Sequence, residues 1–243
     1  MQNIRYMQHK FLGKVDNTNS YSGIPMLCTS GVHEKVFEML VSSNQNKKCK
    51  ILVLGSGSGA FEQRLIDNDY NNIVSVDIET EKFLVKSVKP IKFNLNNDFS
   101  CLGRFDVIVA IEVIEHLENQ FHFMRCVSDM LNDRGVVYLT TPNVESDFAR
   151  IKFFLSGKAH YFGNLEMIET GHINPIFLHI LSYSVNSCGM KIKNHTTNGN
   201  LWTRMLKYER IPTRVIYFIM FFLSRFIPRK NNFEINIFEI CKK

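Results

Sequence analysis

A short apolar run that breaks directly into glycines limits the possible folds of this chain more than any other feature. Residues 51–54 (Ile-Leu-Val-Leu) are followed by Gly55, Gly57 and Gly59, with serines between them. An apolar run of this kind is typical of a buried parallel strand. Glycine allows a sharp turn and a close approach of the backbone to a ligand. The pattern therefore predicts a strand, a tight loop and a helix that bind a ligand through the main chain.

An acidic residue stands at the end of the next legible strand. That strand covers residues 73–77 and ends at Asp77, 18 positions after Gly59. In open α/β sheets, ligands bind beyond the carboxyl ends of the strands, where a carboxylate can accept hydrogen bonds from ribose hydroxyls. The two features together favour a site for a nucleoside-containing cofactor. A glycine turn without any ligand is the alternative interpretation.

Strands and helices alternate along most of the chain. Apolar runs and helical periodicity predict strands at 51–54, 73–77, 91–95, 105–110 and 136–141, and helices at 32–42, 60–68, about 80–87 and 117–131. This alternation indicates a doubly wound parallel sheet. Beyond the fifth strand we expect a helix at 176–187, a strand at 190–194 and a final strand at 233–240. The alternating residues of that final strand suggest one solvent-facing side.

The composition fits one intracellular domain. With 243 residues, of which 45% are hydrophobic, the chain can bury one core, and we assign residues 31–243 to the domain and 1–30 to an N-terminal extension. Six scattered cysteines and an N-terminus without a signal pattern predict reduced thiols and a cytoplasmic protein. The net charge of +6 is compatible with a phosphorylated substrate, RNA or an anionic membrane, but selects none of them.

Several motifs in order give the chain a family resemblance. They are Val53-Leu-Gly-Ser-Gly-Ser-Gly59, Asp77, Asn94-Leu-Asn96, Phe105-Asp-Val-Ile-Val-Ala-Ile-Glu-Val-Ile-Glu-His-Leu-Glu-Asn119 and Leu139-Thr-Thr-Pro-Asn143. Over residues 32–195 the chain resembles the class I S-adenosylmethionine-dependent methyltransferases, in particular the branch with Glu-Val-x-Glu-His after the fourth strand. The resemblance implies an α/β, Rossmann-like fold: a doubly wound, seven-stranded, mostly parallel sheet whose last strand is antiparallel.

The same resemblance implies which residues bind S-adenosylmethionine. The expected set is Gly55, Ser56, Gly57, Gly59, Asp77, Ile78, Asn94, Leu95, Ile111 and Glu112. Asp77 would bind the ribose hydroxyls and Ile78 would lie against adenine, while Ile111 and Glu112 would form the floor of the pocket. Many relatives have an acidic residue just before the first glycine, where this chain has Leu54. We therefore expect the amino-acid end of the cofactor to be held differently.

A dinucleotide site is the rival interpretation of the glycine loop. The residues Gly55-x-Gly57-x-x-Ala60 also satisfy the dinucleotide-binding pattern. However, about 50 residues precede the loop, whereas that pattern usually follows a chain's first strand. A nicotinamide enzyme also has no need for the segment Glu112-Val-Ile-Glu-His116.

Carboxylates and imidazoles gather after the fourth strand. Glu112, Glu115 and His116 would lie at the cofactor edge of the sheet, and the resemblance adds His172, 56 residues after His116. Such a set could bind a divalent cation such as magnesium, manganese or zinc. Alternatively, His116 and Glu115 could act without a metal, with His116 as a general base. As a third interpretation, Glu115 and His116 only cap the helix expected at 117–131.

The resemblance favours a hydroxyl as the methyl acceptor. Thr141-Pro-Asn143 and Gly171-His-Ile173 are most similar to bacterial enzymes that methylate sugars or glycolipids in surface-polysaccharide and natural-product pathways. A quinol precursor and, less expected, the terminal ribose of an RNA are alternatives, and a non-catalytic methyltransferase-like binding subunit is an alternative of another class. We expect a small-molecule or glycolipid acceptor, no nucleic acid, and a monomer or homodimer.

An apolar block at 211–227 falls within an expected helical insertion at about 200–230. Its uninterrupted apolar run, residues 215–223, is too short to span a bilayer. Basic residues next to aromatic ones are typical of a helix that lies on anionic lipid. One expectation is therefore peripheral contact with the inner face of the membrane. A dimer interface and a helix that covers the substrate pocket are the other interpretations.

Overall fold

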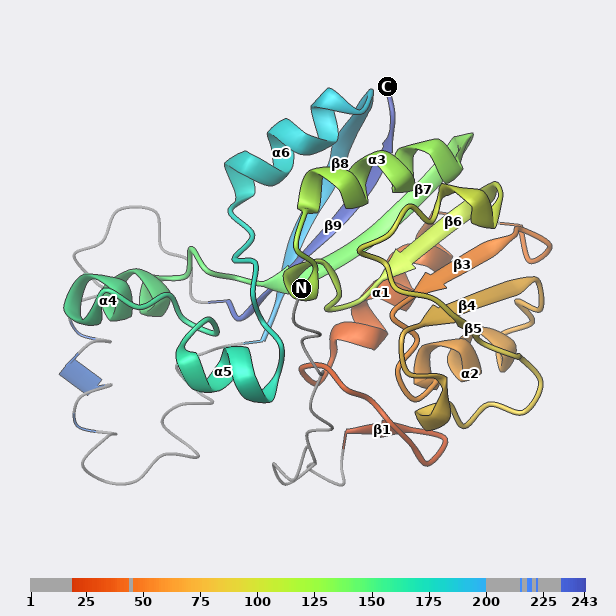
Figure 1. The fold of residues 1–243 in the computed structure, drawn as a ribbon. Coiled ribbons are helices and arrows are strands. Elements are labelled where there is room, and N and C mark those ends of the chain that lie inside the picture. The colour runs from red at the N-terminus through yellow and green to blue at the C-terminus, as the bar shows by residue number, and fades with distance from the viewer. Residues whose placement is uncertain (1–18, 44–45, 200–214, 216–217, 220–221, 223–232) are drawn as a thin grey trace, which may run out of the picture.

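A seven-stranded sheet forms the centre of the protein (Figure 1). The computed structural model describes residues 19–43, 46–199, 215, 218–219, 222 and 233–243. The sheet has the order β5-β4-β3-β6-β7-β9-β8. Its strands are β3 (Ile51–Leu54), β4 (Ile73–Asp77), β5 (Ile91–Lys92), β6 (Phe105–Ala110), β7 (Leu131–Pro142), β8 (Met190–Asn198) and β9 (Ile235–Lys242). The first five pair in parallel, and β9 is antiparallel to both of its neighbours, as predicted.

Helices cover both faces of this sheet (Figure 1). Helices α1 and α2 contribute to the core on one face, and α3 and α6 to the core on the other. Two further helices, α4 and α5, lie beyond the carboxyl ends of the parallel strands. The bounds are α1 (Val32–Ser42), α2 (Ala60–Ile66), α3 (Gln120–Met130), α4 (Asp147–Ser156), α5 (Asn164–Glu169) and α6 (Leu178–Ser187).

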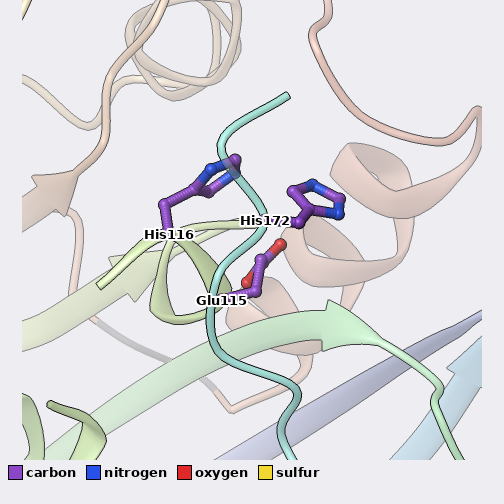
Figure 2. Close-up of side chains that lie close together, drawn as sticks. All are labelled: Glu115, His116 and His172. Carbon is purple, nitrogen blue, oxygen red and sulfur yellow. The ribbon is translucent and has the colours of Figure 1, made fainter. Parts of the chain in front are cut away.

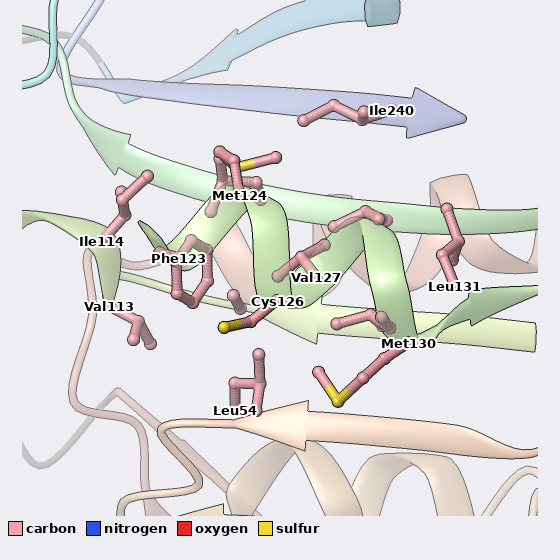
Figure 3. Packing of buried hydrophobic residues seen from close by; sticks show 14 of the residues in the cluster. Leu54, Val113, Ile114, Phe123, Met124, Cys126, Val127, Met130, Leu131 and Ile240 are labelled. Carbon is pink, nitrogen blue, oxygen red and sulfur yellow. The ribbon is translucent and has the colours of Figure 1, made fainter. Parts of the chain in front are cut away.

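Strand β3 shows why the run before the glycines is apolar at every position. Ile51 and Val53 belong to the core that α1 and α2 cover, whereas Leu54 belongs to the core that α3 covers. Figure 3 shows Leu54 beneath the α3 side chains of Cys126 and Met130. Successive side chains of a strand point to opposite faces, so a central strand with both faces covered is apolar throughout.

The helix expected at about 80–87 is wrong. The structure has a single 3-10 turn there, η1 (Thr80–Lys82), followed by extended backbone at Phe83 and a turn at 86–87. The extended segment lies against the glycine loop, because the Leu84 N–H donates a hydrogen bond to the Ser58 carbonyl at 2.9 Å. A tertiary contact thus overrides the local helical pattern.

The helix expected at 117–131 begins later than predicted. Residues Ile114–His116 form a separate 3-10 turn, η3, and α3 begins at Gln120. The side chain of Asn119 caps α3 by accepting a hydrogen bond from the His122 N–H at 3.0 Å. Glu115 and His116 therefore do not cap this helix, and that interpretation is wrong.

The last strand also differs from its expectation, because β9 has no solvent-facing side. Its first six residues are buried, polar ones included. His195 Nε2 lies 3.0 Å from Asn236 Oδ1, and Lys193 pairs with Glu239 at 2.7 Å. Apolar residues of β9 enter both cores, with Ile235 and Ile237 on the α1–α2 side and Phe238 and Ile240 on the α3–α6 side. Asn236 and Glu239 are buried beside side-chain partners on β8 and do not form a solvent-facing side. The other predicted elements differ mainly at their ends; β5 shows the largest loss, with two residues of the five expected.

The described part of the N-terminal extension packs against the domain. Its short hairpin consists of β1 (Ser20–Tyr21) and β2 (Ile24–Pro25). The Ser58 hydroxyl donates to the Pro25 carbonyl, and Met26 is buried near α2. Residues 1–18 lie outside the described part of the chain. So does most of the insertion at 200–230, of which Val215, Phe218, Ile219 and Phe222 are described.

Candidate functional site

The glycine loop requires residues without a side chain for conformational and steric reasons. Gly55, Gly57 and Gly59 have φ angles of 70°, 53° and 89°, in the left-handed region that favours glycine. A Cβ on Gly55 would collide with Val113, and one on Gly59 would lie 2.7 Å from Val85. Only glycine fits this loop without a shift of its neighbours.

Asp77 fixes the loop and remains able to bind more groups. Its Oδ2 accepts a hydrogen bond from the Gly57 N–H, and its Oδ1 accepts one from the Glu79 N–H, both at 2.8 Å. A carboxylate has about four lone-pair sites, so two remain for ribose hydroxyls. Ile78, the next residue, is 45% exposed and offers an apolar surface for a base. The geometry fits the role expected of both residues.

The segment expected at the adenine edge lies beside Asp77. The Phe93 N–H donates to the Asp77 carbonyl at 2.9 Å, which holds this segment against the end of β4. Asn94 then folds into a local turn, because its side chain accepts from the Asn96 N–H at 3.0 Å. Leu95 is buried in the α3-side core. The Leu95 side chain therefore supports this border from beneath, within that core.

A pocket beside the glycine loop includes residues that the sequence did not indicate. Its lining combines the loop with part of the N-terminal extension, the start of α1 and the end of β6: Leu27, Cys28, His33, Val53, Gly57 and Ile111. Burial lowers the pKa of His33 to about 4, so its imidazole is neutral at pH 7. Sequence reasoning missed the N-terminal residues because residues 1–30 show no periodic pattern.

The pocket also corrects the expectation that position 54 lies next to the cofactor. Leu54 faces the α3-side core, on the side of β3 away from this pocket, whereas Val53 lines the pocket. A side chain from this strand could therefore reach the cofactor only from position 53. Val53 is apolar, so the strand supplies no hydrogen-bonding side chain to this pocket.

Glu112 stands at a strained turn after β6. Its φ angle is 53°, which is uncommon for a residue other than glycine. Its N–H donates to Thr140 Oγ1 at 3.0 Å, and the Thr140 hydroxyl donates to Glu112 Oε1 at 2.6 Å. Burial raises the pKa of Glu112 to about 7, although the hydrogen bond from Thr140 opposes this shift. These contacts with β7 hold the turn in place.

Three of the four predicted metal ligands come together (Figure 2). Glu115 and His116 belong to η3, and His172 follows α5; one ligand atom from each lies within 4.8 Å of the others. Backbone hydrogen bonds hold the two segments together, because the N–H groups of Ile173 and Asn174 both donate to the Glu115 carbonyl at 3.0 Å. Glu112 lies outside this group, since its carboxylate binds Thr140.

The Glu115 carboxylate is fully buried and poorly compensated. It is 0% exposed, and neither oxygen has a hydrogen-bond partner among the residues that the structure describes. Burial and the nearby charge of Glu112 raise the pKa of Glu115 well above its usual value, although its own N–H and the Thr141 hydroxyl oppose this shift. An unpaired buried polar group is costly, and a cation or a donating hydroxyl would remove that cost. Figure 2 shows the carboxylate pointing toward His172.

Both imidazoles of the cluster are suited to bind a metal or accept a proton. His172 Nδ1 lies 3.1 Å from the Tyr161 carbonyl, which can only accept, so Nδ1 carries the hydrogen and Nε2 keeps its lone pair. Burial, with His116 nearby, lowers the pKa of His172 to about 4, and burial also lowers the pKa of His116. Neutral imidazole is the form that binds metals.

Tyr161 orients His172, and no pattern in the sequence indicates it. Its φ angle of 68° is strained for an aromatic residue. Its hydroxyl donates to Glu234 Oε1 at 2.8 Å, next to the start of β9. This bond holds the strained residue, whose carbonyl receives the His172 hydrogen.

The donor set and its chemistry fit a divalent cation. Ligand atoms around a zinc- or magnesium-sized ion are roughly 3–4 Å apart, so the separations in the cluster need only a small contraction. The orientation of His172 by a carbonyl is the arrangement usual for histidine ligands of metals. The same atoms also serve a metal-free general base.

Comparison with known proteins identifies the class. A family model for a methyltransferase domain matches residues 32–182, so the chain belongs to this family. Together with the glycine loop and Asp77, this makes it a class I S-adenosylmethionine-dependent methyltransferase, and the dinucleotide interpretation is set aside.

Solved structures share the fold at low sequence identity. A S-adenosylmethionine-dependent methyltransferase from Archaeoglobus fulgidus has a TM-score of 0.58 and 17% identity, with 88% of this chain and 95% of that chain covered. The magnesium protoporphyrin IX methyltransferase of Synechocystis PCC 6803, with bound S-adenosylhomocysteine, has a TM-score of 0.58 and 11% identity, with 87% and 83% covered. These likenesses concern the fold alone.

A curated relative is similar over a shorter stretch. The mitochondrial ubiquinone biosynthesis O-methyltransferase of Rattus norvegicus is 31% identical over 109 residues, which cover 39% of this chain and 31% of that protein. The match thus spans about a third of the relative's length.

Proposed function

We propose that this methyltransferase methylates a hydroxyl oxygen of a sugar or glycolipid, which the Glu115–His116–His172 cluster activates. The observation that carries the proposal is the buried, unpartnered carboxylate of Glu115 beside two neutral imidazoles. Methyl transfer to oxygen requires a nucleophile held close to the methyl group and a way to remove its proton. The cluster lies at the same edge of the sheet as the glycine loop and so can serve both needs.

The residues have distinct roles in this proposal. S-adenosylmethionine supplies an electrophilic methyl group, and the glycine loop with Asp77 would hold it. Glu115, His116 and His172 would hold a divalent cation, which lowers the pKa of a bound hydroxyl. Adjacent sugar hydroxyls offer two oxygens to such a site. Without a cation, His116 would accept the proton itself.

A quinol precursor is the second candidate acceptor. The similarity to the rat ubiquinone biosynthesis O-methyltransferase favours it. A quinol precursor also presents adjacent oxygens on a ring, so the same cluster could bind it. The two candidates differ in the fraction that would contain the acceptor, because a polyprenylated quinol partitions with lipids whereas a free sugar stays in the aqueous phase.

Chelation separates the two chemical versions of the proposal. The purified protein is incubated with labelled S-adenosylmethionine and with lipid and aqueous cell fractions, with and without chelator. With a cation, transfer stops in chelator and returns when magnesium, manganese or zinc is added. Transfer that persists in chelator but is lost in His116→Ala excludes the cation and assigns proton removal to His116. Label in an amine or carboxylate product would contradict hydroxyl methylation altogether.

A further inference from the structure

The last turn of α4 exposes three consecutive large apolar side chains. Phe153, Phe154 and Leu155 are 59%, 87% and 61% exposed, and Gly157 ends the helix in a left-handed conformation. Isolated exposed apolar residues are common, but a contiguous group at a protruding helix end marks an interaction surface. We call these three residues the α4 tip.

The opposite side of α4 holds the helix in place. Phe148, Ala149 and Ile151 are buried, and the Ser146 side chain caps the helix by accepting from the Ala149 N–H at 3.2 Å. Because these buried residues and the cap fix the orientation of α4, its other side faces outward and exposes the α4 tip. In Figure 1, α4 lies at one side of the described part of the molecule, away from the helices that cover the sheet.

The sequence around the α4 tip carries basic residues and no acidic ones. Lys152 and Lys158 flank it, and residues 148–165 include no aspartate or glutamate. Aromatic side chains next to lysines are typical of segments at the surface of anionic membranes. The charge of the segment thus complements an anionic lipid surface, whereas a partner protein would need a matching acidic and apolar face.

The position of the α4 tip connects it to the candidate site. Helices α4 and α5 follow β7 in succession, and the loop after α5 carries His172. Helix α5 also exposes Ile168, which is 60% accessible. A membrane that contacted the α4 tip would therefore lie near the cluster expected to bind the acceptor.

We propose that the α4 tip inserts among the headgroups of an anionic bilayer, so that the enzyme takes a lipid-linked acceptor from the membrane. The proposed contact is with the headgroup region alone. None of the described helices is long and apolar enough to cross a bilayer. Val215, Phe218 and Ile219, from the apolar block, are also more than half exposed and could add to the contact. The acceptor class rests on the proposed function, whereas the docking itself does not.

Vesicle flotation of the full chain tests the docking. The wild-type protein should float with vesicles of phosphatidylcholine and phosphatidylglycerol, and far less with phosphatidylcholine alone. The triple variant Phe153→Ser, Phe154→Ser, Leu155→Ser should lose binding by about tenfold or more. Lys158→Glu should weaken binding to anionic vesicles only. Tyr183→Ser, which removes a 69% exposed aromatic residue from α6, serves as the control and should not change binding.

Two outcomes would overturn the proposal. If the triple variant floats like the wild type, the docking surface lies elsewhere. If the wild-type protein does not float and instead forms a dimer that the triple variant dissociates, the α4 tip is an interface between copies of this chain. Calorimetry with S-adenosylmethionine confirms that each variant is folded. Because flotation needs no turnover, failure of the docking and failure of hydroxyl methylation are separate results.

Discussion

The glycine loop and the Glu115–His116–His172 cluster lie at the same edge of the sheet but are built in opposite ways. In the loop, Asp77 accepts hydrogen bonds from two backbone N–H groups, and packing keeps the glycines bare. In the cluster, both Glu115 oxygens lack a partner among the described residues. The loop is thus a complete scaffold before any ligand binds. In the cluster, burying the Glu115 carboxylate without a partner costs free energy, and a bound cation or hydroxyl would remove that cost.

The comparison predicts that the cluster governs turnover and leaves cofactor binding unchanged. His116→Ala should lower the rate of methyl transfer on the order of 10²–10⁴-fold, because it removes a ligand or the general base. The affinity for S-adenosylmethionine should change little. Transfer assays and calorimetry measure the two effects, and His179→Ala, at an exposed histidine of α6, is the control. An unchanged rate in His116→Ala would mean that the cluster has only a structural role.

The loop should respond in the opposite way. Gly57→Val places a branched side chain where φ is 53° and beside Leu27, so it should weaken S-adenosylmethionine binding by about a hundredfold or more. Gly157→Val provides a control glycine, also at positive φ but with open space around it. Calorimetry measures the affinity, and circular dichroism confirms the fold. Equal losses in both variants would mean that backbone strain, and not the ligand site, causes the effect.

Glu62 of α2 is a fully buried acid next to the glycine loop. It tests whether the residues that support the loop are as fully hydrogen-bonded as Asp77. The Ser75 hydroxyl donates to Glu62 Oε1 at 2.9 Å, but Oε2 lacks a partner among the described residues. Burial raises the pKa of Glu62 from 4.5 to about 7. Between these values the unfolded chain ionises first, so this group lowers stability as pH rises through that window, by up to roughly 3 kcal/mol.

Glu62→Gln should therefore gain stability relative to wild type above pH 7 and lose that advantage below pH 4.5. Urea unfolding at several pH values measures the difference. Glu118→Gln, at an exposed glutamate, should show no comparable dependence. A wild-type-to-Gln difference that stays constant with pH would show that Glu62 is not held neutral by burial.

The smallest predicted effect concerns Tyr161, which acts on the cluster through His172. Tyr161→Phe removes the hydrogen bond to Glu234 and should lower turnover about tenfold without changing cofactor affinity. Nitrogen NMR of His172 should show a shift of the hydrogen from Nδ1 toward Nε2. Glu234→Gln still offers an acceptor to Tyr161 and should have a milder effect. An unchanged tautomer in Tyr161→Phe would contradict the orienting role.

The two regions also differ in how far the sequence predicts them. The glycine loop depends on contiguous residues, so residues 51–59 and Asp77 were sufficient to locate it. The side of β3 that faces the pocket is less evident, because an apolar run has no visible alternation. The sequence therefore does not show that Val53, and not Leu54, lines the pocket. Local pattern thus predicts the element but not the orientation of a fully buried strand.

The cluster depends on contacts that no local pattern contains. A motif indicates Glu115 and His116, and the family resemblance indicates His172. Tyr161, in contrast, acts on the cluster through a contact made only in the folded chain. The error at 80–87 has the same origin, because the extended chain there is held by the glycine loop. Packing between distant segments decided each of these features.

The position of β9 has a consequence for how the protein is made. In the described sheet, β8 pairs with β9 alone, although residues 190–198 precede residues 235–242 in the chain. During ribosomal synthesis β8 must therefore emerge before its partner exists. An unpaired strand is a template for aggregation, and lysines on it, such as Lys191 and Lys193, are a common protection. The nascent chain is exposed to misassembly during the time between the synthesis of β8 and the synthesis of β9. That time, more than the stability of the finished sheet, sets the risk.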